Sequence, residues 1–147
     1  MIDTKVYWEE RLNKSYDLHS VGYKGLGKGY NRFMYKIRRI IFNNFIKKLN
    51  LQKQSEIMDI GSGTGFYIDL WKKAGYKKIT GLDITSIAIK NLTNKYPDFT
   101  FFELDISSGN LPDFKKQFDC ISVKDDLNHK VEDSKFEAAK KNKSEKI

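Results

Sequence analysis

Residues 56–65 read EIMDIGSGTG, a mostly apolar segment that ends in an acidic residue, Asp59, and then runs into three glycines at alternate positions. The apolar segment predicts a buried strand. Gly61, Gly63 and Gly65 predict a tight turn in which the backbone approaches a ligand that side chains would keep away. The pattern is typical of proteins that hold a nucleotide-like cofactor where a strand turns into a helix. The alternative is a tight turn with a purely structural role.

The spacing of the glycines separates two classes of cofactor. A dinucleotide fingerprint is G-x-G-x-x-G, whereas this loop is G-x-G-x-G, with Asp59 two residues before its first glycine. An acid at that place suits a ligand with an amine or a positive charge better than it suits a pyrophosphate. An NAD-type Rossmann domain remains as the second interpretation of the loop.

A second acid follows the helix that the loop is expected to start. Residues 75–84 predict a turn and then a strand that ends in Asp83, eighteen residues after Gly65. An acid at the end of the second strand usually accepts hydrogen bonds from ribose hydroxyls. Because Asp is also common at helix N-caps and in turns, a structural role for Asp83 is the alternative.

Two more strands are predicted further along the chain. Residues 99–106 form the third strand, and its Asp105 is followed by two serines and a glycine that also suit an Asx turn. Residues 118–123 form the fourth strand, and we interpret its Asp119 as structural. The single cysteine, Cys120, lies on this apolar strand and is expected to be a small core residue.

In order and spacing, these segments resemble the motifs of the class I S-adenosylmethionine-dependent methyltransferases. The similar stretches are residues 58–65, 81–84, 104–106 and 118–123, and the resemblance covers roughly residues 5–139. It implies a Rossmann-like α/β/α fold with a mostly parallel sheet, with S-adenosylmethionine as cofactor and S-adenosylhomocysteine as product. The cofactor-binding residues that the resemblance implies are Asp59, Gly61, Ser62, Gly63, Gly65, Asp83, Ile84, Asp105, Ile106, Val123 and Lys124.

The resemblance also implies the chemistry. A sulfonium makes its methyl group electrophilic, so positioning an acceptor and excluding water can supply most of the acceleration. Of the two histidines we prefer His129 over His19 as a base, because His129 follows the fourth strand in a stretch that lies beside the acceptor in the family; a solvated histidine is the alternative. Lys124 would place a cation near the sulfonium unless Asp125 or Asp126 neutralises it. No metal ion is expected.

The chain is expected to divide into three parts. Residues 1–50 form an N-terminal lid and helical segment, residues 51–130 the cofactor-binding core, and residues 131–147 a weakly packed C-terminal helix. Within the lid, residues 20–30 are too rich in glycine for a regular element. The aromatic residues expected to wall the site are Tyr7, Trp8, Tyr16, Tyr23 and Tyr30.

Four strands are fewer than the seven of the complete family fold. We therefore expect a domain truncated after the fourth strand, with that strand at the edge of the sheet. Such a domain could be an active methyltransferase, or a cofactor-binding module that needs a partner to complete the sheet. Self-association through the open edge is a third interpretation.

Composition and charge limit the partners. The chain has 147 residues, which favours one domain, and a net charge of +8, all of it within residues 1–53, which hold twelve Lys or Arg and four Asp or Glu. The basic portion is compatible with nucleic acid, but no nucleic-acid-binding module is recognisable. A small-molecule acceptor is preferred, because residues 7–12 resemble the lead-in of many small-molecule members of the family. Without a long apolar run, no membrane partner is expected, and the setting is predicted to be cytoplasmic.

Most of that charge falls in one predicted helix, residues 31–49. Its apolar residues recur at helical spacing and are expected to pack on the sheet, with the basic residues largely on the opposite side. The residues expected in this packed stripe are Phe33, Ile37, Ile40, Ile41, Phe45 and Leu49.

Overall fold

The structure is a computed structural model that describes residues 3–22, 24–109 and 112–123. The predictions for Lys124, His129 and the C-terminal helix lie outside these residues. The helices are α1 (Thr4–Lys14), α2 (Gly27–Lys48), α3 (Phe66–Lys73) and α4 (Ser86–Lys95), with short 3-10 turns η1 (Lys24–Leu26) and η2 (Ile106–Ser108). The strands are β1 (Glu56–Ile60), β2 (Lys78–Asp83), β3 (Thr100–Glu103) and β4 (Cys120–Val123).

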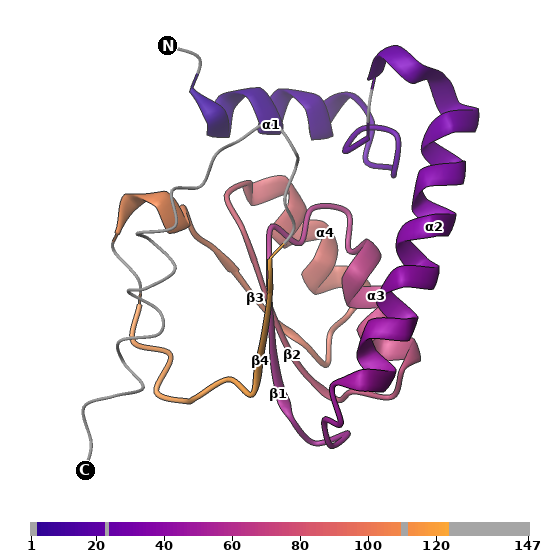
Figure 1. Cartoon of the computed structure of the whole chain (residues 1–147). Helices are drawn as coiled ribbons and strands as arrows, with labels where there is room; N and C mark the ends of the chain where they lie inside the picture. Colours follow the sequence, from indigo (N-terminus) through magenta and orange to yellow (C-terminus); the bar gives the residue numbers. More distant parts are fainter. Residues whose placement is uncertain (1–2, 23, 110–111, 124–147) are drawn as a thin grey trace.

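The strands form one parallel sheet in the order β3-β2-β1-β4 (Figure 1). In the register of the sheet, Asp59 of β1 lies beside Gly81 of β2 and Ser122 of β4, while Asp83 pairs with Glu103. The predicted α/β class with a mostly parallel sheet is confirmed, and β4 is an edge strand within the described residues. Because the strands are parallel, their carboxyl ends meet at one edge of the sheet, where ligands bind in open α/β folds.

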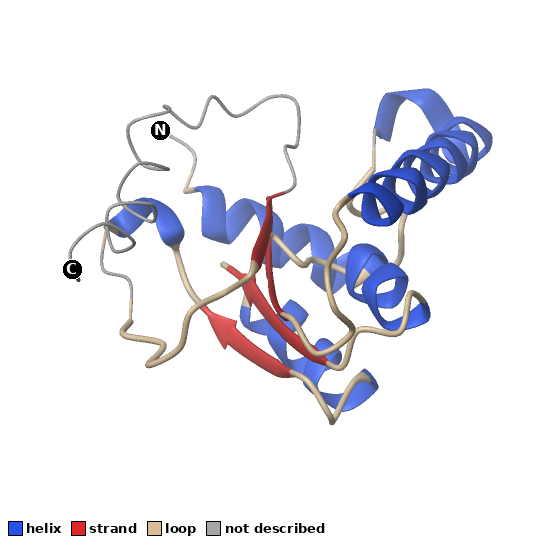
Figure 2. Ribbon diagram, turned by 60° about the horizontal axis from the view of Figure 1, so that its bottom comes forward, coloured by secondary structure: helices blue, strands red, loops and turns tan. Residues whose placement is uncertain are grey.

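The core lies between one face of the sheet and the helices α2, α3 and α4, which Figures 1 and 2 show on the same side. Trp71 of α3 is fully buried at its centre. Its ring packs edge-to-face against Phe42 of α2 at 4.9 Å and Tyr76 at 5.0 Å between centroids. Such aromatic pairs stabilise a core beyond the area they bury. Cys120 packs against this core, as predicted.

On the other face of the sheet, residues 112–118 form a partial cover. Phe114 stands between Phe102 of β3 and Phe118, with centroid distances of 5.6 and 5.7 Å. Lys116 reaches Glu56 at 3.0 Å and the Thr80 hydroxyl at 3.1 Å. These contacts fix the connection between β3 and β4. Asp119 is structural, as predicted, because its carboxylate accepts the Glu56 amide at 2.8 Å.

The packing of α2 corrects the sequence analysis. The helix begins at Gly27, four residues earlier than predicted, and its buried residues are Asn31, Tyr35, Phe42 and Ile46. Phe33, Ile40, Ile41 and Phe45, which were expected to face the sheet, are exposed instead. The helix carries two apolar stripes, and the one that packs inward places Tyr35 against Phe66 and Phe42 against Trp71. Periodicity detects a stripe but does not tell which of two stripes finds a partner.

Among the helices that the structure describes, none combines the length and the apolar composition that crossing a lipid bilayer requires.

Candidate cofactor site

The loop between β1 and α3 turns through left-handed backbone conformations, as its glycines predict. Gly61 has φ = 73° and Gly65 has φ = 81°, values that residues other than glycine rarely adopt. A Cβ on Gly65 would lie 2.6 Å from Cδ2 of Leu92, so the glycine lets α4 approach the loop. A Cβ on Gly61 would meet no atom within 4 Å. The Gly61 side of the loop is therefore open, and a ligand could approach its backbone there.

The amides of this loop are largely satisfied within the protein. Four of them donate internally, those of Gly61, Ser62, Gly63 and Gly65. The Leu82 carbonyl accepts the first two at 2.8 and 3.0 Å, Asp83 accepts the third at 2.7 Å, and the Ser62 carbonyl accepts the fourth at 2.8 Å. Phosphate sites in glycine-rich loops depend on such amides pointing at the anion. The loop therefore fits a pyrophosphate poorly, which weighs against the NAD alternative.

Asp83 connects the loop to the end of β2. Its side chain is 8% exposed. Oδ2 accepts from the Gly63 amide, while Oδ1 accepts from the amide and hydroxyl of Thr85 at 2.9 and 2.6 Å. An ionised carboxylate oxygen can accept two hydrogen bonds, so Oδ2 can also accept a hydroxyl group. The three protein donors hold the carboxylate in one orientation.

Asp59 lies beneath the loop rather than on its surface. Its side chain is 1% exposed and accepts hydrogen bonds from the hydroxyls of Ser62 at 3.1 Å and Ser122 at 2.7 Å. Burying a carboxylate is costly unless hydrogen bonds compensate, and these two hydroxyls supply that compensation. Asp59 therefore acts on the loop through its hydrogen bonds and its charge, and the structure shows no direct opening from it to solvent.

The remaining predicted binding residues lie along the same carboxyl edge. Asp105 is exposed just after β3, and its Oδ1 accepts from the amide and hydroxyl of Ser107 at 2.8 and 2.6 Å. It thus forms the Asx turn that the sequence left as the alternative, and it caps η2. Ile106 is exposed, whereas Ile84 after β2 and Val123 at the end of β4 are partly buried.

The N-terminal segment lies across the carboxyl ends of the strands (Figure 1). Glu9 of α1 accepts from the amide and hydroxyl of Ser86 at 2.6 and 2.8 Å, at the start of α4. Lys5 forms an ion pair with Glu103 at the end of β3. These contacts attach α1 to the start of α4 and to the end of β3.

Tyr16 connects this segment to the loop directly. Its hydroxyl donates to the Gly63 carbonyl at 2.8 Å. Burial raises the pKa of Tyr16 far above its ordinary value, and the nearby charge of Asp83 adds to the effect. The hydroxyl therefore stays protonated, and remains a donor, throughout the physiological range. Val21 packs nearby, with Cγ1 3.6 Å from the place where a Cβ on Gly63 would lie.

The other predicted wall residues are distributed differently. Tyr7 and Trp8 pack edge-to-face at 5.3 Å, and Tyr7 and Tyr30 are exposed. Tyr23 lies outside the described residues. His19 is partly buried, and its Nδ1 has no hydrogen-bond partner among the residues that the structure describes.

Sequence reasoning missed the hydroxyl groups that orient the two acids. Thr85 binds Asp83, and Ser122 binds Asp59 from the neighbouring strand. Thr85 lies two residues after the acid that ends β2, and this proximity was a signal available in the sequence. The pairing of Ser122 with Asp59 depends on the sheet order and could not be read from the sequence.

Comparison with known proteins identifies the family. Residues 57–144 match the sequence family described as methyltransferase domain, and this chain belongs to that family. The resemblance to class I S-adenosylmethionine-dependent methyltransferases is thereby confirmed.

Two curated relatives illustrate the range of the family. The chain is 28% identical over 100 residues to the mRNA cap guanine-N(7) methyltransferase of Schizosaccharomyces pombe. The aligned segment covers 56% of this chain and 28% of that protein. It is 29% identical over 96 residues to the ubiquinone/menaquinone biosynthesis C-methyltransferase UbiE of Campylobacter jejuni, covering 61% of this chain and 40% of that protein. The chain therefore spans well under half the length of either relative.

A solved structure, titled DhpI-SAM-HEP complex, has the same fold. It superposes with a TM-score of 0.59 at 19% sequence identity, over 96% of this chain and 60% of the other.

Proposed function

We propose that this chain binds S-adenosylmethionine at the loop of residues 61–65 and takes part in methyl transfer to a small-molecule acceptor. The observation that carries the proposal is the loop itself. Four of its amides donate within the protein, its open side lies at Gly61, and the oriented carboxylates of Asp59 and Asp83 lie next to it. A cofactor with ribose hydroxyls and a positive charge, and without a pyrophosphate, suits this combination.

The chain's own groups would have distinct roles. Asp83 would accept from the ribose hydroxyls, since Oδ2 retains the capacity for another donor. Asp59 would contribute a negative field below the loop, and Asp105 would lie at the adenine end. Ser62, Gly63, Ile84, Ile106, Val123 and Lys124 complete the proposed cofactor-binding set. His129 is proposed as the base where the acceptor needs one.

When bound, S-adenosylmethionine supplies a methyl group on a sulfonium, and transfer to a nucleophile leaves S-adenosylhomocysteine. The protein would hold the acceptor in line with the breaking carbon–sulfur bond and keep water away. The N-terminal segment is suited to the second task, because Tyr16 and Val21 pack against the loop. We propose that residues 1–50 act as its lid.

The relatives differ in their acceptors. One is named for the guanine of an mRNA cap and the other for ubiquinone and menaquinone biosynthesis. A small molecule is the preferred acceptor here, on the resemblance of residues 7–12 to small-molecule members. A cofactor-binding module without turnover is the second candidate, since the chain spans only part of each relative.

Isothermal titration with S-adenosylhomocysteine tests the proposal. We expect a dissociation constant in the micromolar range for the unaltered chain. Asp83→Asn should weaken binding about tenfold or more, because a hydrogen bond to a charged group contributes roughly 1.5–3 kcal/mol. Asp98→Asn, which alters an exposed acid after α4, is the matched control and should bind like the unaltered chain.

Two results would contradict the proposal. One is a folded chain that does not bind S-adenosylhomocysteine, and the other is a chain that binds NAD instead. Binding of S-adenosylhomocysteine without methylation in an acceptor screen would favour the module without turnover.

A further inference from the structure

The outward surface of α2 combines positive charge with exposed apolar side chains. The helix contains seven Lys or Arg residues and no Asp or Glu. Its inward face is already buried against α3 and the sheet, so neither the charge nor the exposed apolar residues are needed for the fold. Monomeric proteins rarely expose a large contiguous apolar patch without a function for it.

The exposed apolar residues form one row, which we call the outer stripe. Phe33 is 60% exposed, Ile40 53%, Ile41 62% and Phe45 52%. Ile37 lies in the same row and is partly buried. These residues recur at intervals of three and four, which places them along one side of a helix over more than three turns. The row is thus a continuous apolar ridge.

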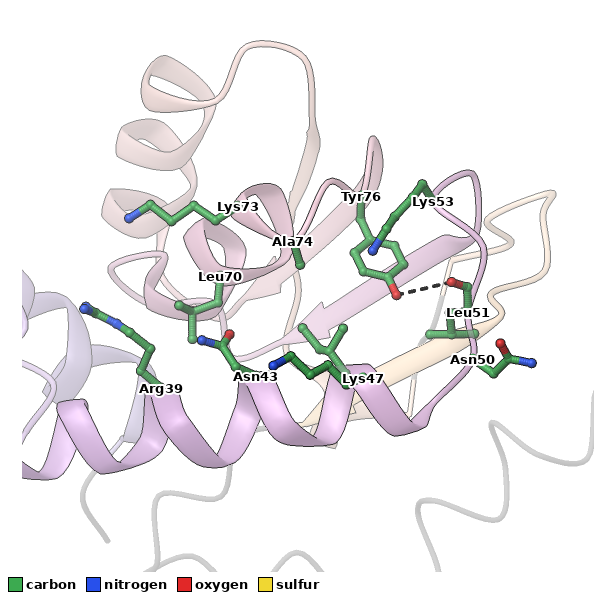
Figure 3. Close-up of a pocket in the computed structure, with 11 residues that line it drawn as sticks. Arg39, Asn43, Lys47, Asn50, Leu51, Lys53, Leu70, Lys73, Ala74 and Tyr76 are labelled. Atoms are coloured by element: carbon green, nitrogen blue, oxygen red, sulfur yellow. Dashed lines mark hydrogen bonds between the residues drawn. The ribbon is translucent and has the colours of Figure 1, made fainter.

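A basic groove borders the outer stripe. Its volume is about 590 Å³, and it lies between α2, the end of α3 and residues 50–53 (Figure 3). Four cations and no acid are among its described lining residues: Arg39, Lys47, Lys53 and Lys73. Lys73 also pairs with Asp69 at 2.7 Å, so the positive charge of the groove comes mainly from the other three. Its floor is apolar, with Ile46 and Leu70 among the lining residues. A groove with this lining suits a phosphate group carried on an apolar molecule.

Figure 3 shows how α2 contributes to both features. Arg39, Asn43 and Lys47 reach from α2 toward α3 and form one row at intervals of four residues. Asn43 and Lys47 lie three and seven residues after Ile40, which is about one and two turns, so the cationic row and the outer stripe are neighbours around the helix. Lys53 places its ammonium 4.5 Å from the centroid of the Tyr76 ring, which holds that cation at the groove.

The groove is separate from the cofactor loop. Leu51 precedes β1 and Tyr76 precedes β2, so the groove opens at the amino-terminal edge of the parallel strands. The loop of residues 61–65 lies at the carboxyl edge. A ligand in the groove would therefore leave the proposed cofactor site accessible.

We propose that α2 docks this protein on an anionic lipid membrane. In this arrangement the outer stripe enters the boundary between headgroups and acyl chains, and the basic groove binds a lipid phosphate. A helix with a basic side and a large apolar side binds membrane surfaces in this way without crossing them. The lack of a long apolar run argues against a helix that crosses a membrane, but α2 needs no such run to lie on a membrane surface.

The chemistry of the surface favours a membrane over two other occupants. RNA would use the cations and could stack a base on Phe33 or Phe45, but it would leave the exposed Ile40 and Ile41 in water. A second copy of this chain pairing through α2 would bring two helices of like charge together, which is unfavourable. An anionic membrane complements both the charge and the apolar ridge.

Sedimentation with vesicles tests the proposal on the full chain. We expect binding to vesicles of phosphatidylcholine with about one-third phosphatidylglycerol, weak binding to phosphatidylcholine alone, and a decrease with added salt. Arg39→Gln with Lys47→Gln should lower the partition coefficient about thirtyfold, at about fivefold for each cation removed. Phe33→Ser with Ile41→Ser should lower it at least about tenfold.

The matched control removes two exposed cations elsewhere. Lys14→Gln with Lys90→Gln has the same change in net charge and should bind vesicles nearly as the unaltered chain does. All the substituted residues are exposed, and circular dichroism checks that each variant folds. Equal losses in the control and the groove variant would overturn the proposal, because net charge alone would then explain binding.

Three other outcomes would also overturn it. The first is a folded chain that does not bind anionic vesicles. The second is tight binding of single-stranded RNA that is the same in the unaltered chain and in the Phe33→Ser, Ile41→Ser double variant, with that RNA also displacing the vesicles. The third is a dimer, seen by sedimentation velocity, that the same apolar variant dissociates.

Discussion

Substituting Gly61 with alanine should affect cofactor binding by the loop more than it affects the stability of the fold. Gly61 has φ = 73°, and a Cβ there meets no protein atom within 4 Å. The folded protein has room for the methyl group, so the cost of the substitution lies in the backbone. A ligand lying against the open side of the loop would compete with the methyl group for the same space.

The expected effect on stability is small. An L-residue in the left-handed region costs about 1–2 kcal/mol. Replacing glycine also removes conformational freedom from the unfolded chain, which returns about 0.4–1 kcal/mol. The free energy of unfolding should therefore fall by about 1 kcal/mol. Binding should suffer more, because forcing atoms into an occupied space costs about 1–3 kcal/mol, or roughly five- to a hundredfold in affinity.

Gly75→Ala is the matched control. Gly75 also has a positive φ, 91°, but lies at the opposite edge of the sheet, and a Cβ there would make ordinary contact with Lys53 at 3.6 Å. Urea unfolding should show similar losses for both variants, whereas titration with S-adenosylhomocysteine should show a loss for Gly61→Ala alone. Unchanged affinity in Gly61→Ala would refute the assignment of the open side of the loop to the cofactor.

Two further predictions concern the lid and the acid stability of the sheet. Tyr16→Phe removes the donor to the Gly63 carbonyl, a hydrogen bond that contributes about 1 kcal/mol. The variant should show faster deuterium exchange in residues 3–22 and about fivefold lower affinity for S-adenosylhomocysteine. Unchanged exchange would contradict this. Burial alone would raise the pKa of Glu56, but hydrogen bonds and charge from Lys116 at 3.0 Å and Lys78 at 3.3 Å lower it below its ordinary value. Because the folded state thus binds the proton less tightly, this stabilisation is present above the unfolded pKa and is lost as the pH falls through the folded pKa. Lys116→Gln should lower the free energy of unfolding by about 0.5 kcal/mol near neutral pH. The difference should shrink as the pH falls through the lowered pKa of Glu56; a constant difference in urea unfolding from neutral to acidic pH would contradict the reasoning.

The cofactor loop was readable in the sequence because its determinants are local. Alternate glycines after an apolar segment specify a left-handed turn, and β1 runs to Ile60, one residue past Asp59, at which the strand was expected to end. The end of β2 at Asp83 was readable for the same reason. The third strand was predicted too long, because Asp105 leaves the sheet to form a turn with Ser107. Local hydrogen bonding of an Asp side chain competes with strand pairing there.

The partners of these residues depend on the tertiary structure. Ser122 reaches Asp59 only because β4 pairs with β1, although sixty-three residues separate the two in the chain. Tyr16 reaches Gly63 only because α1 lies across the carboxyl edge of the sheet. The hydrogen bonds that orient the loop are therefore long-range contacts that no local pattern contains.

The helix α2 shows most clearly what the sequence determined and what it left open. Its amphipathic character and its positive charge were determined by the sequence alone, since both follow from residue spacing and composition. Which apolar stripe turned inward was decided by packing. Tyr35 and Phe42 fit against the rings of Phe66 and Trp71, and Phe33 was left facing solvent. Burial depends on shape complementarity with a neighbouring helix, and that complementarity exists only once the chain has folded.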